Sequence, residues 1–250
     1  KRKSTEQAGW VKNRLRVEAV LAAAASPEPP PIDDLVPDPL LRDEVPDDLA
    51  WLVRLLPRAD VYLQDEVEVA LHPTLTRVWC ARGRRGQRLV EAPGNNHKEY
   101  GFGLVDWRDG WFDWERAPGR RAAPFCAQLR RAVERSQARG RIALVLLDNL
   151  GIHTPKGSLL LRHLLDELRG QLVLVYTPAY DPESNRIEWL WRSLRRAVTH
   201  THTREILALL LQDADTWAQT ISPLEVLHQI GSPFADTPQP LLDESLTDAA

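Results

Sequence analysis

The sequence predicts an α/β fold with one mixed sheet, made of an antiparallel meander and a parallel β-α-β unit, with helices on both faces. Three observations predict it. Residues 61–71 alternate apolar and polar side chains with the period of a strand. Turn residues at 93–96 and 108–110 separate the shorter runs that follow, as in a meander. Two stretches that read as buried strands, 141–147 and 171–176, flank a helical pattern, which favours parallel strands joined by a right-handed crossover.

The elements before the sheet are punctuated by proline. Residues 7–25 have helical character and lead into a proline-rich linker at 26–31. An acidic segment with one short helix at 48–56 follows. We therefore expect three regions: 1–57 with the N-terminal helix, the linker and the acidic segment, 58–225 as the compact domain, and 226–250 as a proline-rich acidic tail.

Within the compact domain the expected elements follow in a definite order. Strands are expected at 61–71, 76–81, 87–91, 99–107 and 111–114, and then as buried strands at 141–147 and 171–176. Helices are expected at 125–138, 156–168, 184–198 and 203–220. Glycines that stop a helix stand at 140 and 170, just before each buried strand.

Three carboxylates contradict the local pattern on three separate elements. Asp65 interrupts the apolar face of its strand, where an ionised group is costly unless it is paired or binds metal. Asp148 follows a buried strand at the carboxyl edge of the sheet, where open α/β folds build their sites. Glu188 borders the apolar stripe of an amphipathic helix. The structural alternatives are a buried ion pair or bulge for Asp65, a helix cap for Asp148, and an i,i+4 pair with Arg192 for Glu188.

Together the three acids predict a metal site that acts on phosphodiesters. Mg²⁺ (or Mn²⁺) takes oxygen ligands, and two such ions can activate a nucleophile and stabilise the leaving oxygen. Three polar residues are candidates for support. Asn149 is expected to hold Asp148 in place, and Asn185 to cap the helix of Glu188. His153 is expected to orient a phosphate or a carboxylate, with capping of the next helix as the alternative.

The net charge of −3 conceals clusters of arginine. One lies at 77–88, a second at 130–141, and a third surrounds Glu188. Segregated charge permits a basic surface for polyanions. The expected DNA contacts are Arg82, Arg84, Arg85, Arg192, Arg195 and Arg196. No apolar run reaches about 18 residues and no secretory signal opens the chain, so we expect no membrane span and a cytoplasmic location.

Two segments resemble the signature of DDE transposases of the mariner-like, bacterial insertion-sequence type. The first is LDN at 147–149 with His153, which is similar to the family pattern DN-x-x-x-H. The second is TPAYDPESNRIEWLW at 177–191, similar to P-x-Y-S-P-x-L-N-P-I-E-x-x-W. The segment QDE at 64–66, with His72-Pro73, Trp79 and Arg82-Gly83, resembles the region of the family's first acid.

The resemblance implies a ribonuclease H-like fold and a catalytic, metal-binding triad of Asp65, Asp148 and Glu188. It also implies metal-dependent cleavage at insertion-sequence ends followed by strand transfer, with double-stranded DNA, both transposon ends and target, as the partner. We further expect a homodimer on DNA, associated with the bacterial nucleoid. Asp181, Ser184 and Arg186 depart from the usual Ser, Leu and Pro without removing an expected ligand.

Two other interpretations stay open. Transposases of this type carry helix-turn-helix modules before the catalytic domain, and residues 1–25 are too few for two of them. We therefore expect the catalytic part of a longer or decayed element, and an inactive or truncated remnant that only binds DNA or other partners is the main alternative. A general ribonuclease H-like nuclease with other substrates is the third.

Overall fold

The sheet of this protein is mixed, as the sequence predicts. The computed structural model describes residues 2–236 apart from 27, 29, 37, 76–81 and 84–93. Within this part, β1 (Ala59–Ala70), β2 (Lys98–Asp106), β3 (Phe112–Ala117), β4 (Ile142–Leu147) and β5 (Leu172–Tyr176) form one sheet in the order β3-β2-β1-β4-β5. The β1–β2 and β2–β3 pairs are antiparallel, and the β1–β4 and β4–β5 pairs are parallel. The strands expected at 76–81 and 87–91 lie outside the described residues.

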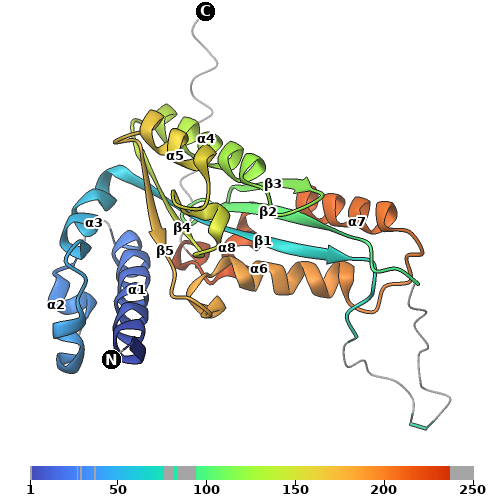
Figure 1. Cartoon of the computed structure of the whole chain (residues 1–250), viewed down its shortest axis with the longest axis horizontal. Coiled ribbons are helices and arrows are strands. Elements are labelled where there is room, and N and C mark those ends of the chain that lie inside the picture. Colours follow the sequence, from blue (N-terminus) through green and yellow to red (C-terminus); the bar gives the residue numbers. More distant parts are fainter. Residues whose placement is uncertain are drawn as a thin grey trace, which may run out of the picture.

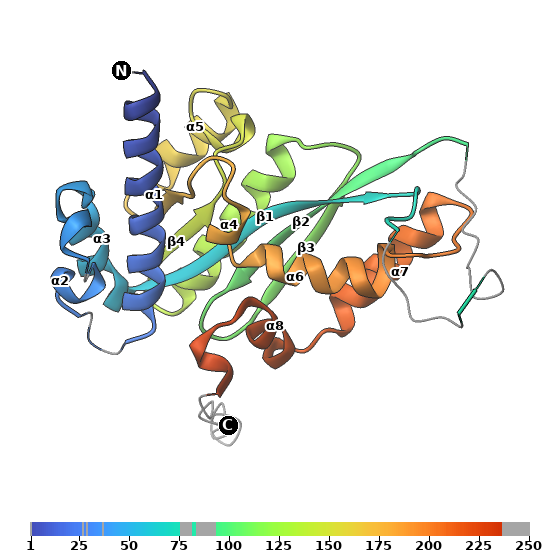
Figure 2. The same ribbon diagram turned by 90° about the horizontal axis from the view of Figure 1, so that it is seen from below.

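Helices cover both faces of this sheet, which confirms the predicted α/β architecture (Figure 1). On one face lie α4 (Ala122–Ala138) and α5 (Leu159–Glu167), and on the other lie α6 (Ile187–Leu194), α7 (Leu207–Thr220) and α8 (Pro223–Ile230). The view from below places α6, α7 and α8 together on their side (Figure 2). No helix among the described residues is both long and apolar enough to cross a membrane.

The middle strand β1 is buried on both of its faces because it has a neighbour on each side and helices above and below. Val61, Leu63 and Val67 face the core that α6 shares, whereas Tyr62 faces the core under α4. The period of two therefore sends adjacent side chains into two different interiors. Consequently Asp65 and Glu66, neighbours in the sequence, are both buried but lie on opposite faces.

The N-terminal helix belongs to the core, although the sequence placed residues 1–57 outside the compact domain. Helix α1 (Arg2–Ala24) contacts β5 and α3 (Leu49–Leu55), and its residues 15, 17, 19–21, 23 and 24 are buried. The short helix α2 (Ile32–Leu35) also contacts α1. The prolines after α1 end the helix, but they do not separate it from the sheet, because the apolar side of α1 completes the core beside α6.

The other expected boundary, between residues 225 and 226, falls inside α8. Ser222 caps this helix in a reciprocal capping box with Glu225, and Gly231 ends it with a φ of +66°. Val226, Leu227 and Ile230 are fully buried. The tail predicted from residue 226 therefore begins after α8, because the apolar residues of this helix are part of the core.

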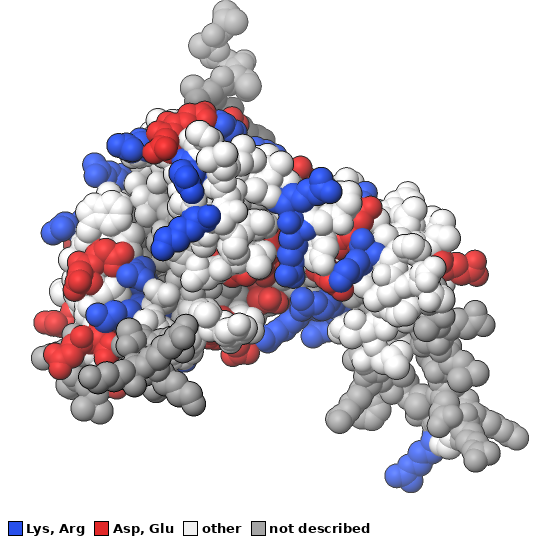
Figure 3. All heavy atoms as spheres, viewed as in Figure 1, with Lys and Arg blue, Asp and Glu red and all other residues white. Residues whose placement is uncertain are grey.

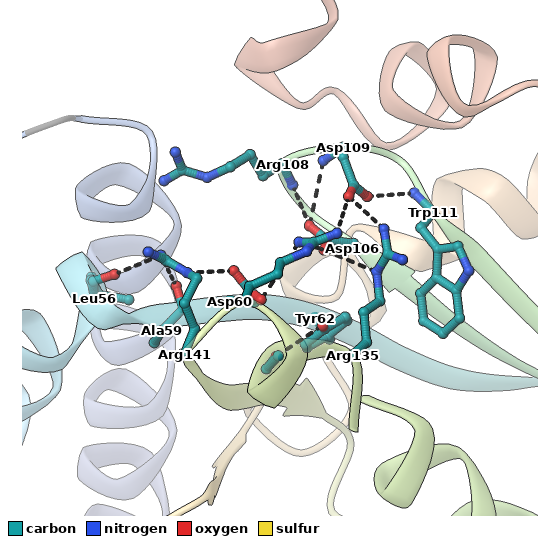
Figure 4. Close-up of polar contacts among 12 residues, drawn as sticks. Leu56, Ala59, Asp60, Tyr62, Asp106, Arg108, Asp109, Trp111, Arg135 and Arg141 are labelled. Carbon is teal, nitrogen blue, oxygen red and sulfur yellow. Dashed lines mark hydrogen bonds and ion pairs between the residues drawn. The ribbon is translucent and has the colours of Figure 1, made fainter. Parts of the chain in front are cut away.

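The arginine cluster at 130–141 pairs with acids of the protein itself. Arg135 and Arg139 contact Asp109 at 2.6 and 2.5 Å, and Arg141 contacts Asp60 at 2.6 Å (Figure 4). The buried Asp106 lies 3.2 Å from Arg139, yet burial and the charge of Asp109 raise its pKa to about 6. These arginines therefore form ion pairs within the protein, because the β2–β3 turn and the start of β1 place acids beside the end of α4.

A glycine in β2 makes room for α6. Gly103 pairs with Asp65 of β1, and a Cβ at this glycine would lie 2.2 Å from the indole of Trp191 and 3.2 Å from Phe112. Gly103→Ala is therefore expected to lower the free energy of unfolding by about 1–3 kcal/mol, measured by urea denaturation, because the indole must shift.

Gly119→Ala is the matched control, since no heavy atom lies within 4 Å of its added Cβ and its φ is not positive. Equal stability of the two variants would contradict the close packing of Trp191 on β2.

Candidate metal and nucleic-acid site

Asp65, Asp148 and Glu188 line one cavity of about 420 Å³. Asp65 comes from the middle of β1, Asp148 follows the end of β4, and Glu188 lies in the first turn of α6. The loop at 177–182, directly after β5, closes one side. Because parallel strands end together at one edge of a sheet, acids that are far apart in the sequence meet there.

Asp65 is the most buried of the three acids, with an exposed fraction of 8%. Trp191 Nε1 donates a hydrogen bond of 3.0 Å to its Oδ2. Burial raises the pKa of Asp65 well above its usual value, and the charges of Glu188, Glu66 and Asp148 raise it further. Among the described residues no basic side chain forms an ion pair with Asp65, and the largest influences on its pKa include no positive charge, so a cation would find favourable ligands here.

Asp148 is held through one oxygen. The backbone N–H of Leu150 donates to its Oδ1 at 3.1 Å, and Nδ1 of His153 contacts the same oxygen. Burial opposes its ionisation, but the hydrogen bond and the charge of His153 outweigh burial and lower the pKa of Asp148. Asp148 is therefore an ionised carboxylate with a fixed orientation, and its side chain remains 43% exposed.

His153 lies between two acids. Its ring is fully buried in the 3₁₀ turn Gly151–His153, with Nε2 2.7 Å from Glu66 Oε1 and Nδ1 beside Asp148. Burial alone would lower the pKa of His153, but the hydrogen bonds to Asp148 and Glu66 raise it to about 9. His153 therefore contacts a carboxylate on each side of its ring. The cap of α5 is Ser158, whose side chain accepts from Leu161 N.

Glu188 is partly exposed, at 25% of its side chain, and its nearest cation is Arg195, with Nη1 3.7 Å from Oε2. Arg192, the alternative partner at i+4, instead contacts Glu183 at 3.0 Å. Glu188 therefore lacks the i,i+4 ion pair with Arg192 that would account for it as an ordinary surface residue. Its position in the first turn of α6 also places its charge beside a favourable helix dipole.

The two asparagines do not act as the sequence suggested. Asn185 makes no side-chain cap of α6; its Nδ2 donates to the backbone carbonyl of Gln64 at 2.9 Å and so ties α6 to β1. Asn149 lines the cavity but makes no hydrogen bond to Asp148 among the described residues, where Leu150 and His153 hold that acid instead. The Asn185 contact joins two segments far apart in the chain, which local spacing does not reveal.

Basic side chains flank the cavity. On the face shown in Figure 3, blue side chains gather near the middle on both sides of acidic atoms. Arg196 is exposed at the end of α6, whereas Arg192 and Arg195 also contact acids. Arg82 is exposed, and Arg84 and Arg85 lie outside the described residues. Arg120 lies outside the arginine clusters that the sequence analysis singled out; it is exposed, lies over the ring of Tyr100 at 5.0 Å, and lowers the pKa of Asp148 by its charge.

The donor set suits a hard divalent cation, which prefers carboxylate oxygens. Among the described residues, however, no three carboxylates, imidazoles or thiols are already arranged as a metal-binding group. The contacts of the acids account for this arrangement: Asp148 is drawn toward His153 and Asp65 toward Trp191, as expected for like charges that repel one another. The cavity therefore offers the right ligands, which must turn toward a common centre to hold an ion.

Comparison with known proteins agrees with this geometry. The family model of DDE superfamily endonucleases matches residues 60–208, more than half of the chain. A relative from Shigella sonnei, described as the insertion element IS630 uncharacterized 39 kDa protein, is 28% identical over 163 residues. This match covers 65% of the present chain and 46% of the relative, so the chain matches less than half of that protein's length.

Solved structures of the Mos1 transposase share the fold. The catalytic domain with Raltegravir and Mg has a TM-score of 0.53 at 15% identity, with 90% of each chain covered. The Mos1 strand transfer complex has a TM-score of 0.52 at 17% identity, covering 73% of this chain and 53% of the other. The ribonuclease H-like fold implied by the resemblance is therefore confirmed, and the family match shows that this chain belongs to the DDE superfamily endonucleases.

Proposed function

We propose that this chain is the catalytic domain of an insertion-sequence transposase, which cleaves DNA strands at the element's ends and transfers them to target DNA in a metal-dependent reaction. The observation that carries the proposal is the convergence of Asp65, Asp148 and Glu188 on one cavity, where burial and like charges raise the pKa of Asp65. The proposed catalytic unit comprises residues 58–225 together with the packed helices α1 and α8.

In this proposal the three acids hold Mg²⁺ or Mn²⁺ in a two-metal site. Bound metal would activate the attacking oxygen and stabilise the leaving oxygen of the phosphodiester. The residues of the chain itself bind and orient. Asp148 is fixed through Oδ1, and Trp191 holds Asp65 at the base of the cavity. Support for divalent metal comes from Mos1 structures, which include a paired-end complex with Mn and a catalytic domain with Mg.

The proposed partner is double-stranded DNA, both the ends of the element and its target. Arg82, Arg192, Arg195 and Arg196 are proposed to contact phosphates, together with Arg84 and Arg85, and Arg120 is added to them because of its place beside Asp148. A paired-end complex of Mos1 with the left transposon end supports DNA binding, and a homodimer on DNA is part of the proposal. The Shigella sonnei relative is an insertion-element protein, and the proposed location is the bacterial cytoplasm, at the nucleoid.

The main alternative is a remnant that binds DNA without cutting it. The convergence of the intact acids on one cavity favours the enzyme over this alternative. A general nuclease that prefers RNA–DNA hybrids is a second alternative, which comparison of hybrid and duplex substrates would reveal.

Substitution of the acids tests the chemistry directly. Asp65→Ala, Asp148→Ala and Glu188→Ala are each expected to reduce metal-dependent nicking of duplex DNA by about a thousandfold or more, because each removes a metal ligand. Nicking of a labelled duplex in Mg²⁺ or Mn²⁺ measures this. Asp166→Ala, which removes an exposed acid of α5 that pairs with Arg169, is the control and should retain the rate. Nicking that persists in all three variants would exclude the triad.

Stability provides a second test. The raised pKa of Asp65 means that the folded state binds its proton more tightly than the unfolded state, so the associated stability is present below pH 3.8 and is lost as pH rises through the folded pKa. Asp65→Asn is therefore expected to raise Tm at neutral pH without metal, by about 2–4 °C per kcal/mol. Mg²⁺ should raise Tm of the unsubstituted protein but not of Asp65→Asn. An unchanged or lower Tm of Asp65→Asn without metal would contradict the charge repulsion between Asp65 and the neighbouring acids.

Salt dependence tests the basic flank. Arg196→Ala is expected to weaken binding of DNA uniformly across sequences and to reduce the slope of log K against log salt by about 1, because it removes one phosphate contact. Fluorescence anisotropy over a range of salt measures this. Arg169→Ala is the control, since Arg169 is exposed after α5 and pairs with Asp166. Identical slopes of log K against log salt for the two variants would show that Arg196 does not contact DNA.

A further inference from the structure

We propose that Glu66 and His153 form a buried clamp that positions Asp148 as a metal ligand. This proposal rests on the function proposed above and assigns a role to Glu66, a residue that the sequence pattern left on the other face of its strand. Glu66 is a positioning residue in this proposal, because it acts on Asp148 only through the imidazole of His153 and does not line the cavity.

The contacts of His153 fix its ring from every side. The His153 side chain is fully buried and that of Glu66 is 2% exposed, with Nε2 and Oε1 2.7 Å apart. The ring lies 4.3 Å from the ring of Phe125 in the first turn of α4. The hydroxyl of Tyr176 donates to the backbone carbonyl of His153 at 2.7 Å, and Gln64 Nε2 donates to Glu66 Oε1 at 3.3 Å. The imidazole therefore has no room to adopt another orientation.

Both ring nitrogens of His153 face a carboxylate oxygen. Glu66 contacts Nε2 and Asp148 contacts Nδ1, so the ring is held between two carboxylates. Glu66 thus fixes the ring from one side, and the fixed ring in turn holds Asp148 from the other.

Asp148 requires such a partner because it stands just after β4, where regular structure has ended. Its hydrogen bonds from Leu150 N and His153 both fall on Oδ1. In the described part of the chain, Oδ2 has no hydrogen-bond partner and is therefore available to a cation. A carboxylate anchored through one oxygen presents the other in a defined direction, which is the arrangement that supports a metal ligand.

The position of the clamp follows from the alternation of side chains along β1. Asp65 points to the face that α6 covers and lines the cavity directly, while Glu66 points to the face under α4 and reaches Asp148 through His153. Two adjacent carboxylates of the central strand therefore support the site from opposite faces of the sheet. This explains why a second acid is buried beside Asp65 in spite of the repulsion between them.

The test compares Glu66→Gln with Glu68→Gln in the full chain. Glu68 lies on the same side of β1, contacts Lys98 and Tyr100, and is outside the cavity, so it is a matched control for loss of charge. Glu66→Gln is expected to weaken Mn²⁺ binding, measured by electron paramagnetic resonance, by about tenfold or more. It should lower kcat for nicking with little change in KM for DNA, whereas Glu68→Gln should change neither.

A packing role for Glu66 would lower Tm and leave Mn²⁺ affinity unchanged. Equal Mn²⁺ affinities of the two variants would therefore overturn the clamp while leaving the proposed function intact. If the unsubstituted protein bound no Mn²⁺, Asp148 would not be a metal ligand, and the clamp would have no metal ligand to position.

A second measurement needs neither metal nor a variant of Glu66. Nitrogen NMR of histidine-labelled protein should resolve the ring of His153, assigned by its disappearance in His153→Gln. In Asp148→Asn the Nδ1 resonance should shift, because its contact with the carboxylate is lost. A His153 ring unaffected by Asp148→Asn would overturn the clamp even if Glu66→Gln failed to fold.

Discussion

The hydrogen bond from Trp191 to Asp65 is the contact around which the rest of the fold is arranged. Asp65 lies in the middle of the central strand, is covered on its own face by α6, and lines the cavity. A carboxylate buried in this way costs several kcal/mol when it is ionised and unpaired. One neutral indole N–H satisfies one oxygen without supplying charge. Trp191 therefore holds the carboxylate of Asp65 in place without neutralising its negative charge. A buried negative charge that is not neutralised favours the binding of a cation.

The same indole determines where Glu188 lies. Trp191 packs where β2 has Gly103, against Phe112 and Trp114 of β3, with Trp217 of α7 beside Phe112. This aromatic packing fixes the rotation of α6 about its axis. Residues three apart lie on neighbouring positions of a helix, so the orientation that brings Trp191 to Asp65 also brings Glu188 to the cavity. Packing and site geometry are thus set by one contact, and a shift of α6 would disturb both.

The sequence predicted the parts of the structure that depend on local periodicity. The alternation of β1, the apolar run of β4 and the stripe of α6 each come from a few consecutive residues, and together they placed Asp65, Asp148 and Glu188 on the right elements. The misses depend on contacts between distant segments. Glu66 looked like a residue of a polar face because a strand's pattern does not reveal that α4 covers it. Likewise, the proline-rich segment after α1 does not indicate that α1 packs against the sheet.

The two ends of the sheet treat their acids differently, and this contrast supports the proposed site. At the end where β1 and β4 begin, Asp60, Asp106 and Asp109 are matched by arginines at 135, 139 and 141 within the protein. Even with those arginines, burial raises the pKa of Asp106 to about 6. At the opposite edge no arginine of the described residues contacts Asp65, and Arg195 reaches Glu188 only at 3.7 Å. Asp148 differs, because His153 contacts one of its oxygens. A buried acid without a basic partner costs stability. The charge of Asp65 is therefore what a bound cation would offset, in keeping with the proposed function.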